Sequence, residues 1–579
     1  MTNLTKYNAW LNGVASDEKH ELEAIRGNAH EIAERFEVDL AFGTAGMRGE
    51  VALGTSRMNV YTVRRATYGL AKYIISCGQS AMDQGVVIAY DTRRMSREFA
   101  FAVAEVLDAS NIKALIFEDV RPVPICSFAI RYYKAFAGVM ITASHNPKEY
   151  NGYKVYGDDG AQMSINSTDN VVNYISKIED YFSLPHTTIL NIYEYKGKSD
   201  KAITPNVTVI GGQVDSAYYD TIIKLSLSPE ITAKFGANIK LVYTPIHGTG
   251  YIPVTTIFKR LGINATVVAS QANPDTEFST VNVPNPESAD TLKLGIEEGE
   301  KISADVVLGT DPDCDRLGVA IRNSEGKFIL LTGNQIGILL LDYILLRLTE
   351  QKSLPQNAAV VKSIVSTTLA DRIAYSYGAK PFNVLTGFKF IGEKIKEWEE
   401  DGKYQYIFGF EESFGTLRGT HARDKDAVVG SMLFAEMMIY YESIGKTVYG
   451  RLIEIFEKYG YYTEKNLTIA YKGLSGMSDM AQVMSKLRTL QIAYLDDEKV
   501  LSVSDYMKGI RQYPDHSEMI AMPESDVIYF ELKNRQFVCI RPSGTEPKLK
   551  IYVLVYANTS SESIEKAERI AKATKELCL

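Results

Sequence analysis

Cysteine is scarce in this sequence, and the positions of the few cysteines exclude most cysteine-based chemistry. The five cysteines are scattered and contain no C-x-x-C pair: Cys77, Cys126, Cys314, Cys539 and Cys578. An odd number without paired spacing argues against both a disulfide framework and a zinc site. The N-terminal residues also lack a basic segment followed by an apolar one, the pattern of a secretory signal. We therefore expect reduced thiols and a cytoplasmic protein.

Positive charge and long hydrophobic runs are also lacking. The net charge is −8, from 63 Lys and Arg against 71 Asp and Glu, with no large basic block. This composition disfavours nucleic acid or an anionic membrane surface as the main partner. The most apolar run, residues 336–348, is interrupted by Asp342 and Arg347 and is too short to cross a bilayer. It predicts a buried helix.

The length of the chain predicts several domains. At roughly 150 residues per domain, 579 residues correspond to about four domains. Hydrophobic and charged fractions of 45% and 23% are those of an ordinary globular protein. We place the domain boundaries near residues 205, 325 and 455, which gives domains at 1–205, 206–325, 326–455 and 456–579.

Strand and helix patterns alternate through the first three predicted domains. Predicted strands at 86–90, 113–117 and 137–141 are separated by helical patterns, which is typical of an α/β sheet. The same order recurs around predicted strands at 239–243, 305–309, 358–365 and 404–409. The last domain differs, because strands at 527–532, 536–540 and 548–556 are joined by short turns and followed by one helix. This predicts an antiparallel α+β domain.

Three acidic residues follow the predicted strand at 305–309. In the segment TDPDCDR, Asp311, Asp313 and Asp315 occupy alternate positions, so a turning backbone can direct their carboxylates at one point. Hard oxygen ligands of this kind suit Mg²⁺. An EF-hand calcium loop is excluded, since its sixth position would be Gly and here is Arg316. A solvated acidic turn is the structural alternative to a metal site.

A serine follows the predicted strand at 137–141 in the segment TASHNP. Ligands bind at the carboxyl ends of strands in open α/β sheets, and a turn there would expose the Ser144 hydroxyl. A hydrolase nucleophile is poorly supported, because there is no G-x-S-x-G motif and adjacency to His145 does not by itself supply a base. Taken alone, Ser144 is equally well explained as a turn residue.

Together with four other segments, these two motifs give a resemblance that extends over nearly the whole chain. The motifs are FGTAGMRG at 42–49, TASHNPKEYNGYK at 142–154, DPDCDR at 311–316, TGFK at 386–389, GFEESFG at 409–415 and RPSGTEPK at 541–548. In this order they resemble those of the α-D-phosphohexomutase family, and more closely its bacterial α-phosphoglucomutase branch.

The resemblance implies a fold, a reaction and two cofactors. The expected fold has three similar α/β domains around a central cleft and a C-terminal α+β domain that is similar to the TATA-binding protein. The expected reaction is the reversible interconversion of α-D-glucose 1-phosphate and glucose 6-phosphate. It would use a phosphoserine, Mg²⁺ and glucose 1,6-bisphosphate as activator and intermediate.

The resemblance also implies roles around the phosphoryl group. Ser144 would be the phosphoserine, and its oxygen would join Asp311, Asp313 and Asp315 around Mg²⁺. Lys154 would be the general base, which requires cationic neighbours such as Arg48 or the metal to lower its pKa. Arg48, His145 and Arg316 would lie beside the transferring phosphate.

Further residues are implied for the sugar and for the phosphate that does not react. Glu411 and Ser413 would bind sugar hydroxyls, while Thr386 and Lys389 would reach the sugar or a phosphate. The dock for the second phosphate would be formed by four residues of the last domain: Arg541, Ser543, Gly544 and Thr545. For residues 272–287, which are rich in polar loop residues, we expect only an architectural role.

Several alternatives remain open at this stage. A phosphomannomutase or a phosphopentomutase would reuse Ser144 and the aspartates with different sugar contacts. A non-catalytic sugar-phosphate-binding protein would be expected to lose the serine or a carboxylate, and this chain retains all of them. A kinase is disfavoured because no phosphate-binding loop motif is present. We expect sugar phosphates as partners, no nucleic acid or membrane, and a monomer or weak homodimer.

Overall fold

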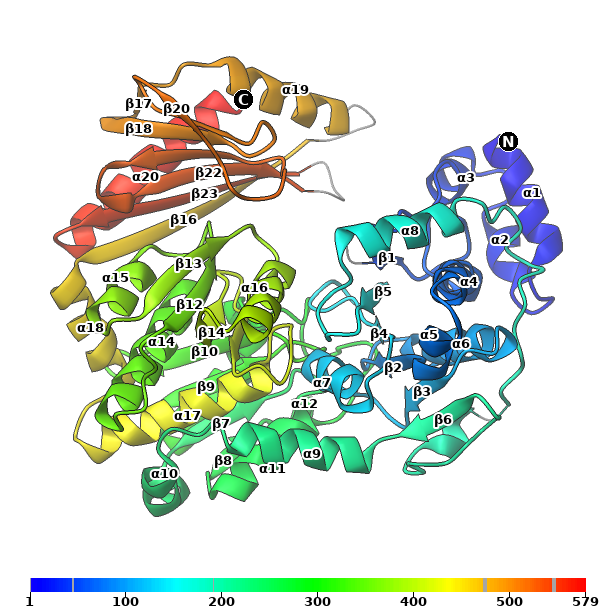
Figure 1. The fold of residues 1–579 in the computed structure, drawn as a ribbon, viewed down its shortest axis with the longest axis horizontal. Helices are drawn as coiled ribbons and strands as arrows, with labels where there is room; N and C mark the ends of the chain where they lie inside the picture. The colour runs from blue at the N-terminus through cyan, green and yellow to red at the C-terminus, as the bar shows by residue number, and fades with distance from the viewer. Residues whose placement is uncertain (1, 44–45, 191, 472–475, 544–547) are drawn as a thin grey trace.

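Four β-sheets follow one another along the chain (Figure 1). The computed structural model describes residues 2–579 except 44–45, 191, 472–475 and 544–547. The first sheet lies on the right in Figure 1, the second and third lie at the lower left, and the fourth lies above them. This arrangement confirms the predicted fold class of three α/β units followed by an antiparallel α+β unit.

The first sheet has strand order β1-β5-β4-β2-β3-β6. Its strands are β1 (Gly46–Glu50), β2 (Val86–Tyr90), β3 (Ala114–Phe117), β4 (Ala137–Ile141), β5 (Tyr150–Tyr156) and β6 (Val207–Ile210). The four strands β2, β3, β4 and β6 are parallel, whereas β5 and β1 are antiparallel additions. Helices α4 (Val60–Ser76), α6 (Ser96–Ala109), α7 (Val123–Tyr133) and α8 (Ile165–Ile175) accompany this sheet.

A glycine permits the pairing of the two antiparallel strands. Gly46 has φ +119°, and a Cβ there would lie 1.8 Å from the carbonyl oxygen of Tyr153 on β5. Only glycine therefore fits this position. The register that results places Gly46 opposite Lys154 and Arg48 opposite Gly152. Two predicted site residues, Arg48 and Lys154, thus lie on neighbouring strands.

The second and third sheets repeat the α/β pattern. The second has order β11-β10-β9-β7-β8, formed by β7 (Leu241–Thr244), β8 (Ala265–Val267), β9 (Val306–Thr310), β10 (Leu317–Arg322) and β11 (Phe328–Leu330). The third has order β13-β12-β14-β15, formed by β12 (Ala358–Ser363), β13 (Lys380–Val384), β14 (Gln405–Phe410) and β15 (Thr416–Arg418). Both carry antiparallel strands beside parallel ones, since β10 pairs with β9 and β15 pairs with β14.

Helices around these two sheets include α9 (Gly212–Ile223), α11 (Tyr251–Leu261), α13 (Ala289–Ile302), α14 (Gly333–Glu350), α15 (Leu369–Ser376), α16 (Phe388–Asp401) and α17 (Ala427–Ser443). Helix α14 contains the apolar run at 336–348, and the residues of that run are buried except Leu346 and Arg347, which are partly buried. The prediction of a buried helix is confirmed. In the described part of the chain, no single helix is long and apolar enough to cross a membrane.

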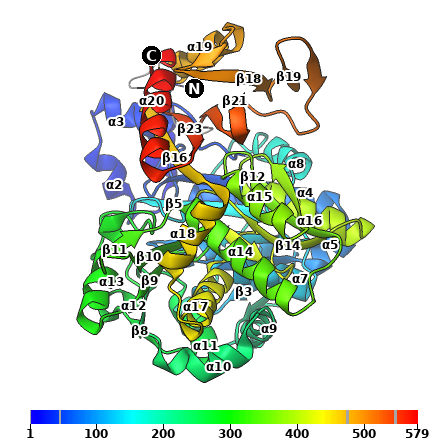
Figure 2. The same ribbon diagram turned by 90° about the vertical axis from the view of Figure 1, so that its left-hand side faces the viewer.

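The fourth sheet is antiparallel throughout its described pairings. Its main strands are β16 (Tyr461–Ala470), β18 (Glu498–Asp505), β21 (Ile528–Leu532), β22 (Phe537–Pro542) and β23 (Lys548–Ala557), with α19 (Gly476–Thr489) and α20 (Ser560–Leu577) as helices. Helix α18 (Val448–Tyr459) leads into β16 and lies directly below it in Figure 2. The first and last strands of the unit, β16 and β23, pair over ten residues each.

Three N-terminal helices were not predicted from the sequence. They are α1 (Asn3–Gly13), α2 (Lys19–Ala24) and α3 (Ala29–Phe36). Trp10 lies at the centre of their aromatic core, with ring centroids of Phe36 and Tyr61 at 5.8 and 5.6 Å. The helices are short, so their stability depends on this packing rather than on intrinsic helix propensity.

The domain boundaries near 205, 325 and 455 stay predictions. By strand pairing, β6 at Val207–Ile210 belongs to the first sheet, although it follows the predicted boundary at 205. Likewise β11 at Phe328–Leu330 belongs to the second sheet, although it follows the boundary at 325. Both edge strands therefore complete the sheet that precedes the boundary.

A buried ion pair joins α14 to α18. Asp342, the acidic residue in the apolar run, is fully buried, and its two carboxylate oxygens each accept a hydrogen bond of 2.9 Å from the Arg451 guanidinium. The hydroxyl of Tyr377 donates a further hydrogen bond of 3.1 Å. The charge in this apolar helix is therefore fully partnered, as a buried charge requires.

We predict that Asp342→Ala destabilises the protein by about 3–5 kcal/mol, because it leaves the Arg451 charge without its buried partner. The melting temperature should fall by about 6 °C or more in a thermal unfolding scan. Glu350→Ala is the matched control, since Glu350 is exposed at the end of the same helix and its pair with Arg347 contributes less than about 1 kcal/mol. Equal melting temperatures for the two variants would contradict the prediction.

Candidate active site

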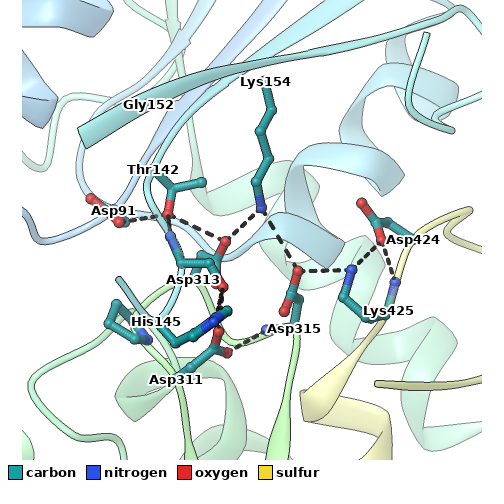
Figure 3. Close-up of polar contacts among 12 residues, drawn as sticks. Asp91, Thr142, His145, Gly152, Lys154, Asp311, Asp313, Asp315, Asp424 and Lys425 are labelled. Carbon is teal, nitrogen blue, oxygen red and sulfur yellow. Dashed lines mark hydrogen bonds and ion pairs between the residues drawn. The ribbon is translucent and has the colours of Figure 1, made fainter. Parts of the chain in front are cut away.

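Strand ends from two sheets meet at one point, which is shown in Figure 3. The chain leaves β4 at Ile141 and enters the turn with Ser144, and it leaves β9 at Thr310 and enters the turn with Asp311. The Ser144 hydroxyl donates a hydrogen bond of 2.8 Å to Asp311. The backbone N–H of Val123, at the start of α7, also donates to the carbonyl of Asp313. The first two α/β units thus share one site.

The three predicted metal ligands form a buried cluster. One ligand oxygen from each of Asp311, Asp313 and Asp315 lies within 4.8 Å of the other two. One oxygen of Asp313 and one of Asp315 are buried without a hydrogen-bond partner among the described residues. Burial and the charges of Asp313 and Asp315 raise the pKa of Asp311 well above its ordinary value. A site that holds unpartnered carboxylate oxygens at this spacing fits a divalent cation.

The turn at Ser144 has a strained backbone. Ser144 has φ +51°, a left-handed conformation that is uncommon for residues other than glycine. Its N–H donates a hydrogen bond of 2.8 Å to the Thr142 hydroxyl, which in turn lies 2.6 Å from Asp91 and 3.2 Å from Asp313. Strained residues of this kind cluster at functional sites. The serine is buried, so its hydroxyl faces the carboxylates rather than bulk water.

Two lysines balance the negative charge of the cluster. Lys154 on β5 lies 2.9 Å from Asp313, and Lys425 lies 3.1 Å from Asp315 and 2.9 Å from Asp424 (Figure 3). Burial lowers the pKa of Lys154, but Asp313 and Asp315 outweigh it and hold the pKa above its ordinary value. These carboxylates act against the lowering of the Lys154 pKa that a role as general base requires, and that role stays a prediction.

His145 and Arg48 lie beside the serine. The Nδ1 atom of His145 is 3.2 Å from the Ser144 hydroxyl oxygen, a hydrogen bond that adjacency in the sequence did not predict. Burial, followed by the charges of Arg316 and Arg48, lowers the His145 pKa well below its usual value, so the ring is neutral at pH 7. Arg48 donates a hydrogen bond of 2.8 Å to the side chain of Asn146 in the same turn.

Arg316 is held by a segment for which the sequence predicted only an architectural role. Its guanidinium lies 2.7 Å from Glu287, the last residue of the segment 272–287. The backbone N–H of Arg316 donates a hydrogen bond of 2.9 Å to Asp311, so the residue is tied to the carboxylate cluster as well. The segment 272–287 therefore orients a predicted site residue.

The predicted sugar residues of the third unit also come together. Glu411 follows β14, is buried, and accepts a hydrogen bond of 2.7 Å from the N–H of Gly387, between Thr386 and Lys389. Burial and the neighbouring Glu412 raise the Glu411 pKa to about 7. The Thr386 hydroxyl is buried and has no partner among the described residues. Ser413 is half-buried two residues after Glu411.

The link from this segment to the carboxylate cluster is direct. Arg316 and Gly415 form an isolated β-bridge between the turn that carries the three aspartates and the turn that carries Glu411. The Arg316 side chain also acts on Glu411, where its charge favours the ionised carboxylate. The third unit therefore borders the same site as the first two.

Two of the four residues predicted to dock a phosphate, Arg541 and Ser543, lie in the described part of the fourth unit. Arg541 is in β22 and pairs with Lys550 of β23, and the Ser543 N–H donates a hydrogen bond of 2.7 Å to Lys548. Partial desolvation, followed by the charges of Arg541 and Arg316, lowers the pKa of Lys550. Gly544 and Thr545 lie outside the described residues. Arg316 and Arg541 thus act electrostatically on one lysine, which the sequence analysis did not single out.

Arg93 was also missed by the sequence analysis. It is buried, pairs with Asp91 at 3.4 Å, and its guanidinium donates to four backbone carbonyls of the serine turn. These acceptors are the carbonyl oxygens of Ser144, Asn146, Pro147 and Tyr150. The only signal in the sequence for this role is that Arg93 follows the end of β2, at the same edge of the sheet as Ser144. Arg93 therefore fixes the conformation of the turn.

We predict that Arg93→Lys loosens the serine turn while the sheet stays folded. Lysine keeps the charge, but a single ammonium cannot reach four carbonyls that a planar guanidinium reaches. Each lost hydrogen bond removes a net stabilisation of about 1 kcal/mol. Amide hydrogen exchange in residues 143–151, measured by mass spectrometry, should therefore be about tenfold or more faster. Arg94→Lys, at the exposed neighbouring position, should leave the exchange unchanged. Unchanged exchange in Arg93→Lys would exclude the role.

The comparisons with known proteins agree over most of the chain. Three family models match in sequence: phosphoglucomutase/phosphomannomutase α/β/α domain I at residues 39–182, domain II at 216–326 and domain III at 332–459. A phosphoglucomutase of Staphylococcus haemolyticus is 36% identical over 525 residues, which cover 90% of this chain and 90% of that protein. A phosphoglucomutase of Staphylococcus aureus is 34% identical over 90% of this chain and 91% of that protein.

Solved structures share the fold at low sequence identity. The open form of parafusin, a phosphoglucomutase of Paramecium, has a TM-score of 0.68 at 17% identity and covers 93% of this chain and 96% of its own. A putative phosphomannomutase of Thermus thermophilus has a TM-score of 0.67 at 20% identity and covers 93% of this chain and 99% of its own. The domain models and the identity to curated relatives show that the chain belongs to the phosphoglucomutase/phosphomannomutase family.

Proposed function

We propose that this protein interconverts α-D-glucose 1-phosphate and glucose 6-phosphate through a phosphorylated Ser144. The observation that carries the proposal is the buried hydrogen bond of 2.8 Å between the Ser144 hydroxyl and Asp311, inside a cluster of three carboxylates. Curated relatives at 34–36% identity over 90% of the chain are phosphoglucomutases, which favours glucose among the possible sugars.

A divalent metal fits the carboxylate cluster, and we propose Mg²⁺. Asp311, Asp313 and Asp315 would hold it together with the oxygen of Ser144, since all are oxygen ligands and two carboxylate oxygens have no other partner among the described residues. When bound, Mg²⁺ supplies charge neutralisation at the oxygens of a transferring phosphoryl group. The desolvation that burial imposes on these carboxylates makes such neutralisation favourable.

The side chains around the serine suggest how one half-reaction proceeds. A sugar hydroxyl oxygen attacks the phosphorus of phosphoserine, a new O–P bond forms, the bond from phosphorus to the Ser144 oxygen breaks, and the hydroxyl proton passes to a base. We assign Lys154 as that base. Lys154 would accept the proton in its neutral form, which becomes accessible when Asp313, the carboxylate that stabilises its ammonium, is engaged as one of the proposed metal ligands. His145 is neutral and 3.2 Å from the Ser144 oxygen, so it is placed to carry a proton as well.

The remaining site residues are assigned to positioning. Arg48 and Arg316 would neutralise the transferring phosphate, and Glu411 with Ser413, Thr386 and Lys389 would bind the sugar. The non-reacting phosphate would dock on the fourth unit, on Arg541, Ser543, Gly544 and Thr545. The intermediate, glucose 1,6-bisphosphate, would reverse its orientation between the two half-reactions and would also load the serine. We further propose that the protein works in the cytoplasm as a monomer or weak homodimer.

We predict that Ser144→Ala abolishes conversion of glucose 1-phosphate to glucose 6-phosphate in a coupled assay supplemented with glucose 1,6-bisphosphate, because the only proposed phosphoryl carrier is removed. The wild type should prefer glucose 1-phosphate to the 1-phosphates of mannose, glucosamine and ribose. Ser176→Ala, an exposed serine of the same unit, is the control and should keep full activity. Substantial turnover by Ser144→Ala would exclude the phosphoserine assignment, and a preference for mannose would exclude the assignment of glucose.

We predict that Asp313→Asn weakens Mg²⁺ binding by about 10- to 100-fold, since it removes an anionic ligand from the cluster. The change should appear in a calorimetric Mg²⁺ titration and as a higher Mg²⁺ concentration for half-maximal activity. Asp305→Asn is the matched control, because Asp305 is exposed just before β9, at the opposite end of the strand from the cluster. Unchanged Mg²⁺ affinity in Asp313→Asn would place the metal elsewhere.

A further inference from the structure

A second cavity lies between the second and third units and includes none of the residues of the proposed active site. Its volume is about 570 Å³, within the range of about 300–1,000 Å³ that is usual for small-molecule sites. Its lining includes the start of β14, the end of β15, the end of α16 and Leu225 after α9. The proposed function assigns no task to this cavity.

The cavity contains a cation without a close counter-charge. Among the described residues, Arg418 makes one hydrogen bond, of 3.3 Å from Nε to the Leu225 carbonyl, and no ion pair. Glu436, the carboxylate whose charge acts on Arg418, already accepts hydrogen bonds from Ser226, the N–H of Leu227 and Tyr343. Both terminal nitrogens of the guanidinium therefore remain for a ligand.

The partial burial of this arginine is an unusual feature. It lowers the pKa of Arg418 to about 10, which still leaves the side chain charged at neutral pH. A charge that has lost part of its hydration is stabilised by a partner of opposite charge. The guanidinium presents a planar fork of donors that matches the oxygens of a phosphate or a carboxylate. An anion at this position would supply the missing partner.

The rest of the lining suits an apolar portion of a ligand. Trp398 is buried in the wall and is braced by Phe382, with ring centroids 4.8 Å apart, and by Tyr404 at 5.5 Å. Ile395 is fully buried behind this wall, and Tyr404 is its partly exposed ring. Glu399, the one carboxylate in the lining, is engaged by Arg423 and by Arg131. The cavity thus combines a free cation with an aromatic wall.

We infer that this cavity binds a small anionic molecule, which places a phosphate or carboxylate group on Arg418 and an apolar group against the aromatic wall at Tyr404 and Trp398. The geometry that supports this is the cavity itself, the single hydrogen bond of Arg418 and the braced aromatic wall. The ligand is thus distinguished from a sugar phosphate in the active site by its apolar part.

The segment that lines this cavity returns directly to the active site. Beyond Arg418 the chain passes Gly419 and Thr420 in the lining, and it returns to Asp426, whose N–H donates a hydrogen bond of 2.8 Å to the Thr416 carbonyl. Lys425, which lies 3.1 Å from Asp315, is in this returning stretch. We name residues 418–426 the return loop.

The chain offers an intrinsic probe for the test. It has two tryptophans, Trp398 in the cavity wall and Trp10 in the N-terminal helices. The full-length protein is titrated with inorganic phosphate and separately with phenyl phosphate, and tryptophan fluorescence is recorded. We expect a saturable change with both probes, with phenyl phosphate binding at least about tenfold more tightly because its ring reaches the aromatic wall. The change should disappear in Trp398→Phe.

Variants separate this cavity from the active site. Arg418→Gln should weaken binding of both probes by about tenfold or more, while the mutase activity stays within about twofold of wild type. Ser353→Phe places a large side chain at the exposed rim of the cavity and should also weaken binding. It replaces Arg418→Gln as the test variant if Arg418→Gln does not fold. Arg541→Ala, in the proposed phosphate dock, should leave the fluorescence titration unchanged.

Three results would overturn the inference. These are a fluorescence response that does not saturate, equal affinity in wild type, Arg418→Gln and Ser353→Phe, or loss of the response in Arg541→Ala. The last result would assign the response to phosphate in the active site. None of the three bears on the proposed mutase reaction, which is tested by Ser144→Ala.

Discussion

Mutual repulsion among three buried carboxylates is the constraint on which the rest of the site depends. Asp311, Asp313 and Asp315 are drawn together by a short turn after β9, and burial makes their charges costly. Two cations from different units offset this repulsion by ion pairing. They are Lys154 on β5 of the first unit and Lys425 after β15 of the third. The negative charge of this one turn therefore attracts lysines from two other units, so that three units meet at the carboxylate cluster.

This constraint also explains why the chemistry lies at the boundary between units. The two lysines that pair with Asp313 and Asp315 come from the first and third units, so this part of the charge balance forms only when the units pack together. The serine turn is held from within its own unit by Arg93, and from outside by the hydrogen bond to Asp311. A phosphate on Ser144 would thus enter a site whose charges are already arranged around it, which limits reorganisation during transfer.

Much of the fold was predictable because hydrophobic patterns report strands and helices directly. The strands at 86–90 and 137–141 and the buried helix at 336–348 follow from continuous apolar runs, and Asp311, Asp313 and Asp315 follow from their spacing. Arg93, Lys425 and Glu287 were not predicted, since each acts on a partner more than 25 residues away. Arg418 was missed for the opposite reason. It is notable because it has no ion-pair partner among the described residues, and no local sequence pattern indicates this.

The return loop at 418–426 has a consequence for how this region tolerates change. Its first residues line the second cavity, and near its end Lys425 lies against Asp315. The hydrogen bond from the Asp426 N–H to the Thr416 carbonyl joins the end of the loop to β15. An inserted or deleted residue between these points would shift the ammonium relative to the carboxylate, whereas exchanging side chains at Thr420 would not. Selection should therefore act on the length of this loop more strongly than on its composition, so that relatives differ there in residue type but not in residue number.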